Sequence, residues 1–197
     1  MVLELLLISG ALAVLSTLII ILRNMKHATI IFVCQQLVFA ILLFLSASWE
    51  TALSRAIAGC LIIPYLLRWG IRKTNEEEIK PTVGGTPLII LLIFLTFIIY
   101  AVARVSFDPL SFSIITLTSF GLMGLLVRRD ILKMIICLNI AEGGVHLLVA
   151  SATPVIALDV SLDVAMILST LLGIYLATVL YTEYKTLDAW KMKVLKW

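Results

Sequence analysis

The chain has 197 residues, of which 62% are hydrophobic and 14% are charged, and its mean hydropathy is +1.15. A soluble globular domain is nearer half apolar and a quarter charged, so this composition excludes that class and indicates an integral membrane protein. The net charge is +3, but the basic residues lie in short clusters between apolar runs. This arrangement indicates membrane topology and no nucleic-acid partner.

A membrane-spanning helix needs about 20 mainly apolar residues, and the chain contains about seven such runs. We therefore predict an all-α, polytopic membrane protein. In chain order, the spans are predicted over residues 2–22, 28–47, 52–71, 87–107, 110–127, 131–152 and 156–182.

The connectors between these runs are mostly short. RNMKH, SWE and RRD force neighbouring helices to run antiparallel, which predicts one compact bundle over residues 1–197. The longer connector over residues 72–87 mixes charges with Gly and Pro and is typical of a surface loop. We divide the bundle into four helices (1–107), three helices (110–182) and an interfacial tail (183–197), in which Lys and Trp alternate.

The distribution of Lys and Arg predicts the orientation. If the N-terminus lies outside the cell, 13 of the 15 basic residues lie on the cytoplasmic side, and only Arg55 and Arg104 lie near the outer face. This bias predicts an outside N-terminus, a cytoplasmic C-terminus and, with it, an odd number of spans.

The sixth run carries ionisable residues where apolar ones are expected. Glu142 lies 13 residues after Arg129, or about 20 Å along a helix, which is near the middle of a bilayer roughly 30 Å thick. Asn139 and His146 lie about one turn to either side, so the three residues form a polar stripe on one face. A carboxyl group at this depth is costly, and we expect it to face protein or internal water.

Two interpretations of this stripe stay open. Glu142 and His146 can take part in an ion pathway as protonatable groups, or they can be hydrogen-bonding links between helices. Polar links are usually Ser, Thr, Asn or Gln, which favours the pathway. Gly143 and Gly144 indicate either the close approach of another helix or a local bend that admits water.

Other polar residues in the spans are weaker candidates. Asp163 in the last run is a candidate for either a functional or a structural role, and it can pair with Arg55 of the third run. Asp159 and Arg104 are expected to lie at the membrane interface with their charged ends in water. Cys34, Cys60 and Cys137 are expected to be small buried hydrophobic residues, and no motif predicts a metal, a cofactor or independent catalysis.

The segment over residues 120–150 resembles subunit K of respiratory complex I and the small subunit of multisubunit cation/proton antiporters. It has a glycine-containing helix, the turn Arg128-Arg129-Asp130-Ile131 and a helix with a buried glutamate. A longer stretch resembles hydrogenase-4 component E of formate hydrogenlyase, through FVCQQLVFA (32–40), IIPYLLRWGIRK (62–73) and NIAEGGVHLLVA (139–150), followed by LDVAMIL.

This resemblance assigns residues by position. Glu142 matches the buried glutamate of component E, Asn139 matches that of the three-span relatives, and Asp163 matches an aspartate of component E. The chain departs from its relatives at two positions. Ser169 stands near the place of the second glutamate of subunit K, and Gly59 replaces a lysine of component E, with Arg55 one turn earlier.

The resemblance implies a function for the chain within a larger assembly. The implied role is that of a non-catalytic, multi-pass subunit of a [NiFe]-hydrogenase or formate hydrogenlyase type complex in a prokaryotic plasma membrane. Such a subunit holds no cofactor and carries buried charges, here Glu142, His146, Asp163, Asn139 and Arg55, for proton or Na⁺ movement. Its partners are a complex I-like channel subunit, large antiporter-like subunits and lipids, with the hydrogenase and iron–sulfur subunits reached indirectly. The alternatives are a subunit of a redox-free cation/proton antiporter and a structural scaffold.

Overall fold

The computed structural model describes residues 2–74, 85–106, 109–153 and 155–188. Within these ranges the fold is all-helical, as predicted, and the only extended pairing is an isolated bridge between Asp130 and Asp188. The helices are α1 (Val2–Ile21), α2 (Met25–Ser46), α3 (Trp49–Ala56), the π-helix η1 (Ile57–Ile62), α4 (Ile63–Lys73), α5 (Gly85–Ser106), α6 (Pro109–Val127), α7 (Ile131–Ala152) and α8 (Ile156–Tyr184).

Six helical segments are long and apolar enough to cross a membrane, and α5 contributes a shorter apolar helix over Pro87–Ile99 among the described residues. The third span is continuous from Trp49 to Lys73 and includes α3, η1 and α4. The prediction of a polytopic, all-helical membrane protein is therefore confirmed, whereas its orientation stays a prediction.

Two helices begin three residues earlier than predicted because side chains cap them. The Asn24 side chain accepts hydrogen bonds from the backbone N–H groups of Lys26 and His27, so α2 starts at Met25. Ser48 accepts a hydrogen bond from Thr51 N–H in the same way, and α3 starts at Trp49. An N-cap satisfies backbone donors that a helix start would leave unpaired.

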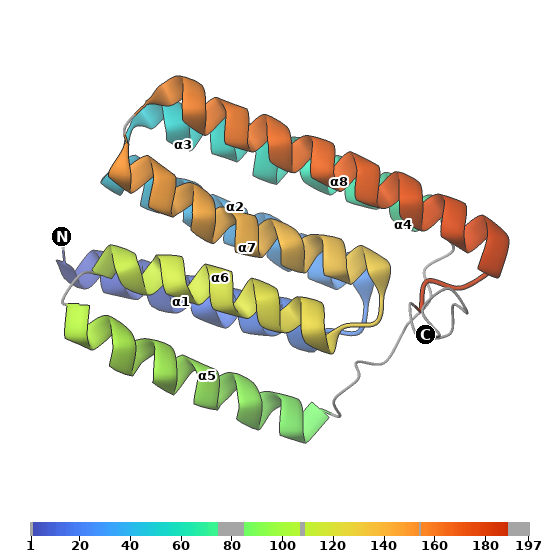
Figure 1. Cartoon of the computed structure of the whole chain (residues 1–197), viewed down its shortest axis with the longest axis horizontal. Coiled ribbons are helices and arrows are strands. Elements are labelled where there is room, and N and C mark those ends of the chain that lie inside the picture. Colours follow the sequence, from blue (N-terminus) through green and yellow to red (C-terminus); the bar gives the residue numbers. More distant parts are fainter. Residues whose placement is uncertain (1, 75–84, 107–108, 154, 189–197) are drawn as a thin grey trace.

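The helices form two layers (Figure 1). In one layer α6 packs on α7 and α7 packs on α8, and in the other α1 packs on α2 and α2 packs on α3. The layers meet where α1 contacts α6, α2 contacts α7, and α3 and α4 contact α8, while α5 lies beside α6. We call the end where α1 begins the N-terminal end of the bundle and the end where α8 finishes the C-terminal end.

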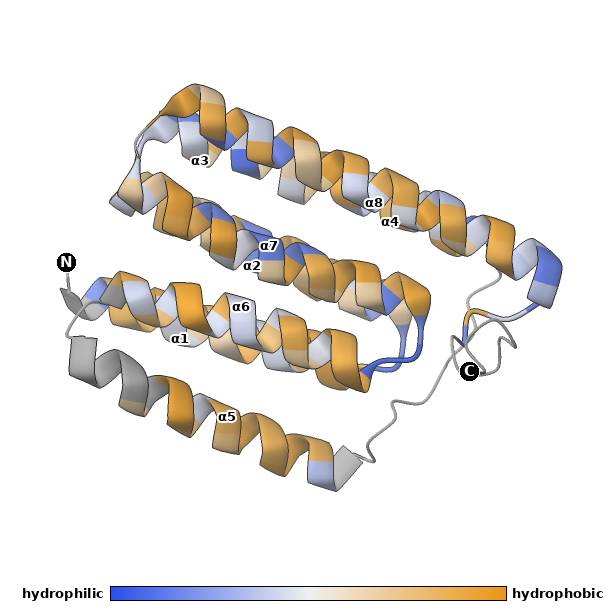
Figure 2. Cartoon of the chain, in the orientation of Figure 1, coloured by the Kyte–Doolittle hydropathy of each residue, from blue (hydrophilic) through white to orange (hydrophobic). Residues whose placement is uncertain are grey.

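Apolar side chains cover the outside of the bundle as well as filling its interior. Leu126, Tyr65 and Phe97 are 78%, 71% and 70% exposed, and apolar colour dominates the helices in Figure 2. A soluble protein of this size avoids such a surface, whereas a membrane protein presents it to lipid. Several polar side chains are instead fully buried inside the bundle, which makes them the candidates for function.

Some sequence predictions fall outside the described residues. The middle of the 72–87 connector, the tail beyond Asp188 and the side chain of Arg104 belong to this group. The expectation for the cysteines is partly wrong: all three are free, but Cys34 is exposed, Cys60 is partly buried and only Cys137 is fully buried. Cys34 differs because it lies on the outward face of α2.

Candidate functional site

The polar stripe of α7 faces α8. Asn139 exchanges hydrogen bonds with Thr170, at 2.9 Å from Asn139 Nδ2 to Thr170 Oγ1. Glu142 accepts a hydrogen bond from Ser169, and His146 lies against the first turns of α8. The predicted stripe is therefore real, and its three members meet three successive levels of one neighbouring helix.

Glu142 lies at the middle of α7 and is half-buried. Ser169 Oγ lies 3.3 Å and 3.4 Å from its two carboxylate oxygens, and it can also donate to the Met166 carbonyl at 3.0 Å. By the resemblance to subunit K, Ser169 is expected near the place of that family's second glutamate. A hydroxyl group that can turn between two acceptors there gives Glu142 a partner without adding a second charge.

The two glycines beside Glu142 have different neighbours. A Cβ atom at Gly144 would lie 2.9 Å from the Ile114 carbonyl oxygen of α6, so this glycine lets α6 and α7 approach closely. A Cβ atom at Gly143 would lie 3.3 Å from Arg55 Nη2, so this glycine makes room for the arginine. Of the two explanations left open by the sequence, close approach is the one observed, since α7 is helical throughout.

The predicted pair of Arg55 and Asp163 is present. Arg55 Nη1 lies 3.4 Å from Asp163 Oδ1, and their side chains are 0% and 3% exposed. The guanidinium also contacts the Met166 sulfur and stacks over the Phe39 ring at 4.9 Å from its centroid. A desolvated guanidinium over an aromatic face is stabilised by a cation–π interaction, which fixes Arg55 between α2, α3 and α8.

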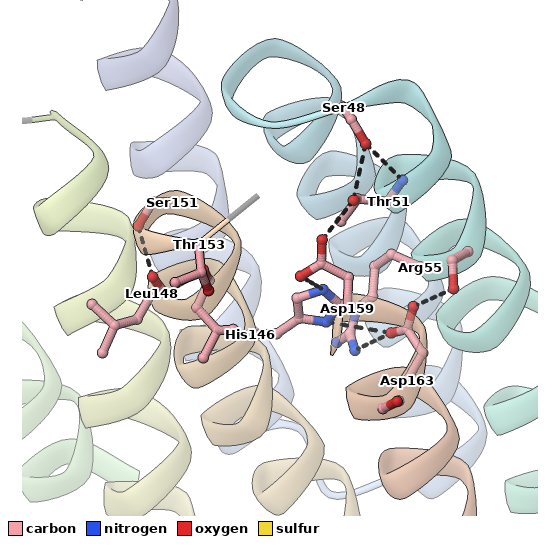
Figure 3. A network of polar contacts seen from close by, with 12 residues as sticks. Ser48, Thr51, Arg55, His146, Leu148, Ser151, Thr153, Asp159 and Asp163 are labelled. Atoms are coloured by element: carbon pink, nitrogen blue, oxygen red, sulfur yellow. Dashed lines mark hydrogen bonds and ion pairs between the residues drawn. The ribbon is translucent and has the colours of Figure 1, made fainter. Parts of the chain in front are cut away.

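His146 lies between two carboxylates (Figure 3). Its Nε2 is 3.6 Å from Asp159 Oδ1, its Nδ1 is 3.4 Å from Asp163 Oδ1, and its side chain is 1% exposed. The Phe39 ring closes the site from α2, with its edge against the imidazole at a centroid distance of 6.3 Å.

Asp159 corrects one sequence prediction. It was expected at the interface with its carboxylate in water, but it is 1% exposed. Thr51 donates a hydrogen bond of 2.7 Å to its Oδ2, and His146 faces its Oδ1. Asp159 is drawn inward because it lies four residues before Asp163, on the face of α8 that meets α3 and α7.

These residues form one group at the N-terminal end of the bundle, which we call the N-end cluster. It consists of Thr51, Ser54, Arg55, His146, Asp159 and Asp163. Ser54 donates a hydrogen bond of 2.6 Å to Asp163 Oδ2. Arg55 Nη2 reaches the backbone of α7 at Gly143, the residue next to Glu142, so the cluster extends towards the midpoint of α7. Within the described part of the chain, no three His, Cys, Asp or Glu side chains are arranged to hold a metal ion.

Sequence reasoning missed Thr51, Ser54 and Asp159 as members of this site. A signal for them was present, because Thr51, Ser54 and Arg55 have the spacing of one helical face, as do Asp159 and Asp163. What the spacing could not provide was the pairing of these two faces, which are more than 100 residues apart in the chain.

A second group of buried charges lies at the C-terminal end, and we call it the C-end cluster. It consists of Arg128, Asp130 and Lys133, which are all at most 2% exposed. Arg128 donates to the Leu22 carbonyl at 2.8 Å, and Lys133 donates to the Arg23 carbonyl. The Asp130 side chain caps α7 through Leu132 N–H at 3.0 Å. These charges tie the α6–α7 connector to the α1–α2 connector.

Comparison with known proteins assigns the C-terminal part of the chain. Residues 109–197 match the family described as NADH-ubiquinone/plastoquinone oxidoreductase chain 4L. The match starts at the first residue of α6 and covers less than half of the chain. No curated protein and no solved structure matches the chain. The region of α6, α7 and α8 is thus similar to a complex I-type membrane subunit, as its sequence predicted, while the resemblance to hydrogenase-4 component E stays a prediction.

Proposed function

We propose that the chain is a non-catalytic membrane subunit of a complex I-like assembly of the [NiFe]-hydrogenase or formate hydrogenlyase type, in a prokaryotic plasma membrane. In such an assembly electron transfer in peripheral subunits drives proton or Na⁺ movement through membrane subunits. The chain supplies protonatable groups to that movement and binds no cofactor of its own.

The observation that carries this proposal is the position of Glu142. It lies at the middle of a spanning helix, half-buried, with a hydroxyl partner in Ser169 and the charge of Arg55 in reach. It also lies within the region that matches chain 4L. A carboxyl group that is placed there at considerable cost, and is not neutralised by a direct ion pair to any described residue, can accept and release a proton.

The exposed side of Glu142 indicates where the partners bind. Leu138 and Val145 lie one turn before and after it on α7 at 36% and 47% exposure, and Leu148 extends this exposed side at 51%. A carboxyl group that faces lipid at this depth is unfavourable, so a neighbouring membrane subunit is expected to cover this surface. The candidates for this neighbour are the large antiporter-like subunits and the channel subunit that the family resemblance implies. In such an assembly Glu142 would link the buried charges of the subunits on either side of it.

The function is tested with the assembled complex in sealed vesicles, by comparing ion uptake per electron transferred in wild type and Glu142→Gln. We expect uptake to fall on the order of a hundredfold, as is usual when a proton-transferring side chain is lost, while the complex still assembles. The matched control is Glu183→Gln, because Glu183 is exposed near the end of the neighbouring helix α8. Normal coupling in assembled Glu142→Gln complex would leave only a scaffold role.

The identity of the complex is tested by purifying it through this chain. Nickel-containing and iron–sulfur subunits in the purified material support the hydrogenase type. Antiporter-like subunits without any redox subunit would instead assign the chain to a cation/proton antiporter, whose small subunit resembles the same α6–α8 region.

A further inference from the structure

The N-end cluster contains buried polar atoms that lack hydrogen-bond partners. Among the described residues, neither ring nitrogen of His146 makes a hydrogen bond, and the same is true of Asp159 Oδ1 and of Nε and Nη2 of Arg55. Buried polar atoms usually have hydrogen-bond partners. Those without a partner are often found at functional sites. Two of these atoms face each other, since His146 Nε2 lies 3.6 Å from Asp159 Oδ1, and His146 Nδ1 lies 3.4 Å from Asp163 Oδ1 (Figure 3).

The charges of the cluster balance when it holds one added proton, on His146 or on one of the two carboxylates. Arg55 carries one positive charge and the two carboxylates carry two negative charges, so a neutral imidazole leaves one uncompensated charge in the bundle interior. The groups that face His146 are Asp159 and Asp163 from α8, Arg55 from α3 through Asp163, Phe39 from α2, and Glu142 one turn away on α7. The sequence of α6, which packs on the other face of α7, contains no ionisable side chain.

A row of exchangeable protons connects His146 to the end of the bundle. Ser48, the N-cap of α3, is partly exposed, and its hydroxyl lies 3.0 Å from that of Thr51. Thr51 donates to Asp159 Oδ2 at 2.7 Å, and Asp159 Oδ1 lies 3.6 Å from His146 Nε2. This row leads from the surface at the N-terminal end to the imidazole without crossing an apolar layer.

We propose that His146 is a proton-loading site, filled and emptied from the N-terminal end of the bundle through Ser48, Thr51 and Asp159. Thr51 passes its hydroxyl proton to Asp159 and accepts a proton from the Ser48 hydroxyl. Ser48 in turn takes up a proton from water. Rotation of the carboxylic acid then delivers the proton to Nε2, while Nδ1–H faces Asp163. One proton leaves the water and one imidazolium forms, with no electron transferred and no other bond changed.

Asp163 passes this change on to Glu142. Its carboxylate is shared between His146 Nδ1, Arg55 Nη1 and Ser54. When His146 becomes cationic, it competes with Arg55 for the Asp163 carboxylate. The positive charge of Arg55 is then less neutralised by Asp163 and stabilises the Glu142 carboxylate more strongly. Loading of His146 therefore favours the release of a proton from Glu142. This coupling rests on the function proposed above, whereas the loading of His146 does not.

The loading step is tested by ¹⁵N magnetic resonance of the histidine ring in the 197-residue chain in lipid nanodiscs. The chain has two histidines, so His27→Gln leaves His146 as the single reporter. We expect its ring nitrogens to take both the neutral and the cationic shifts over the pH range in which the chain stays folded. We also expect Thr51→Val to slow exchange of the ring proton with water at least about tenfold.

Thr96→Val is the control, because Thr96 lies on α5 and, among the described residues, its hydroxyl donates to the Leu92 carbonyl of its own helix. Ser48→Ala, at a partly exposed position, is a second way to interrupt the row if Thr51→Val unfolds the chain. A ring that keeps one protonation state across the range, or exchange equally fast in the Thr51, Ser48 and Thr96 variants, would overturn the proposal. If His146 loads normally but Glu142→Gln leaves ion coupling intact, the proposed function fails and the loading site stands.

Discussion

The two ends of the bundle bury charges in different ways. At the C-terminal end, Arg128 and Lys133 donate to backbone carbonyls of the α1–α2 connector, and Asp130 caps a helix, with one long ion pair of 4.0 Å between Lys133 and Asp130. At the N-terminal end, Arg55, His146, Asp159 and Asp163 face other side chains from three helices. Both groups are almost inaccessible to water.

This difference separates structural charges from functional candidates better than burial does. A backbone carbonyl has a fixed dipole and cannot take up a proton, so a cation bound to it holds two connectors together. A carboxylate or an imidazole changes charge, so each member of a side-chain cluster alters the preferred state of the others. We therefore expect changes at the N-end cluster to disturb proton movement as well as stability, and changes at the C-end cluster to affect stability alone.

Arg55→Met gives the largest expected effect on stability. It removes the arginine of the N-end cluster. The imidazole of His146 is then the one group in the cluster that can neutralise the carboxylates of Asp159 and Asp163. Removing one member of a buried pair typically costs about 3–5 kcal/mol. The free energy of unfolding is measured by titrating the micellar chain with sodium dodecyl sulfate and following its circular dichroism.

The double variant Arg55→Met/Asp163→Asn restores neutrality and is expected to recover most of this loss. Arg68→Met is the matched control, because Arg68 is exposed on α4. A cost at Arg55 no greater than that at Arg68 would show that the two carboxylates do not need the arginine.

Gly144→Ala is expected to have an intermediate effect and to act on one end of α7 more than on the other. The new Cβ atom would clash with the backbone of α6 near Ile114 and Thr118, and overpacking of this kind costs about 1–3 kcal/mol. It also pushes α7, with His146, towards the two carboxylates of α8. Thermal unfolding measures the cost, and the ¹⁵N shifts of His146 report the displacement.

Gly10→Ala is the control for this variant, because a Cβ atom there would meet nothing within 4 Å. Alanine is the better helix former, so Gly10→Ala should leave stability equal or higher. Equal effects of the two substitutions would mean that α6 and α7 are not in close contact at Gly144.

Asp130→Ala should give the smallest loss, about 1 kcal/mol, because it removes a helix cap. Asp130→Asn keeps the cap and removes the charge. Burial raises the pKa of Asp130 above its ordinary value of 3.8, so the folded chain holds the proton more tightly than the unfolded chain. The wild type should therefore lose stability relative to Asp130→Asn as pH rises from 3.8 through the raised pKa. Unfolding curves of both proteins over that pH range check the sign, and an opposite trend would mean that Lys133 outweighs burial.

The sequence by itself determined the class of protein, the approximate limits of most spans and the polar stripe of α7, whereas the described part of the structure has six candidate spans and one shorter apolar helix where seven spans were predicted. Hydrophobic runs and periodicity are local properties, and in a membrane the backbone must form helices to satisfy its own hydrogen bonds. The same local geometry placed Glu142 at the middle of its helix and His146 one turn away, and both positions are observed.

Only the tertiary structure decided which polar faces meet. The contact of Thr51 with Asp159 joins residues 108 positions apart, and no spacing along the chain predicts it. It arises because α8 packs on both α3 and α7, so that two carboxylates one turn apart reach an arginine and an imidazole from different helices. By its sequence position alone Asp159 was expected at the membrane interface. This packing makes it a direct neighbour of His146.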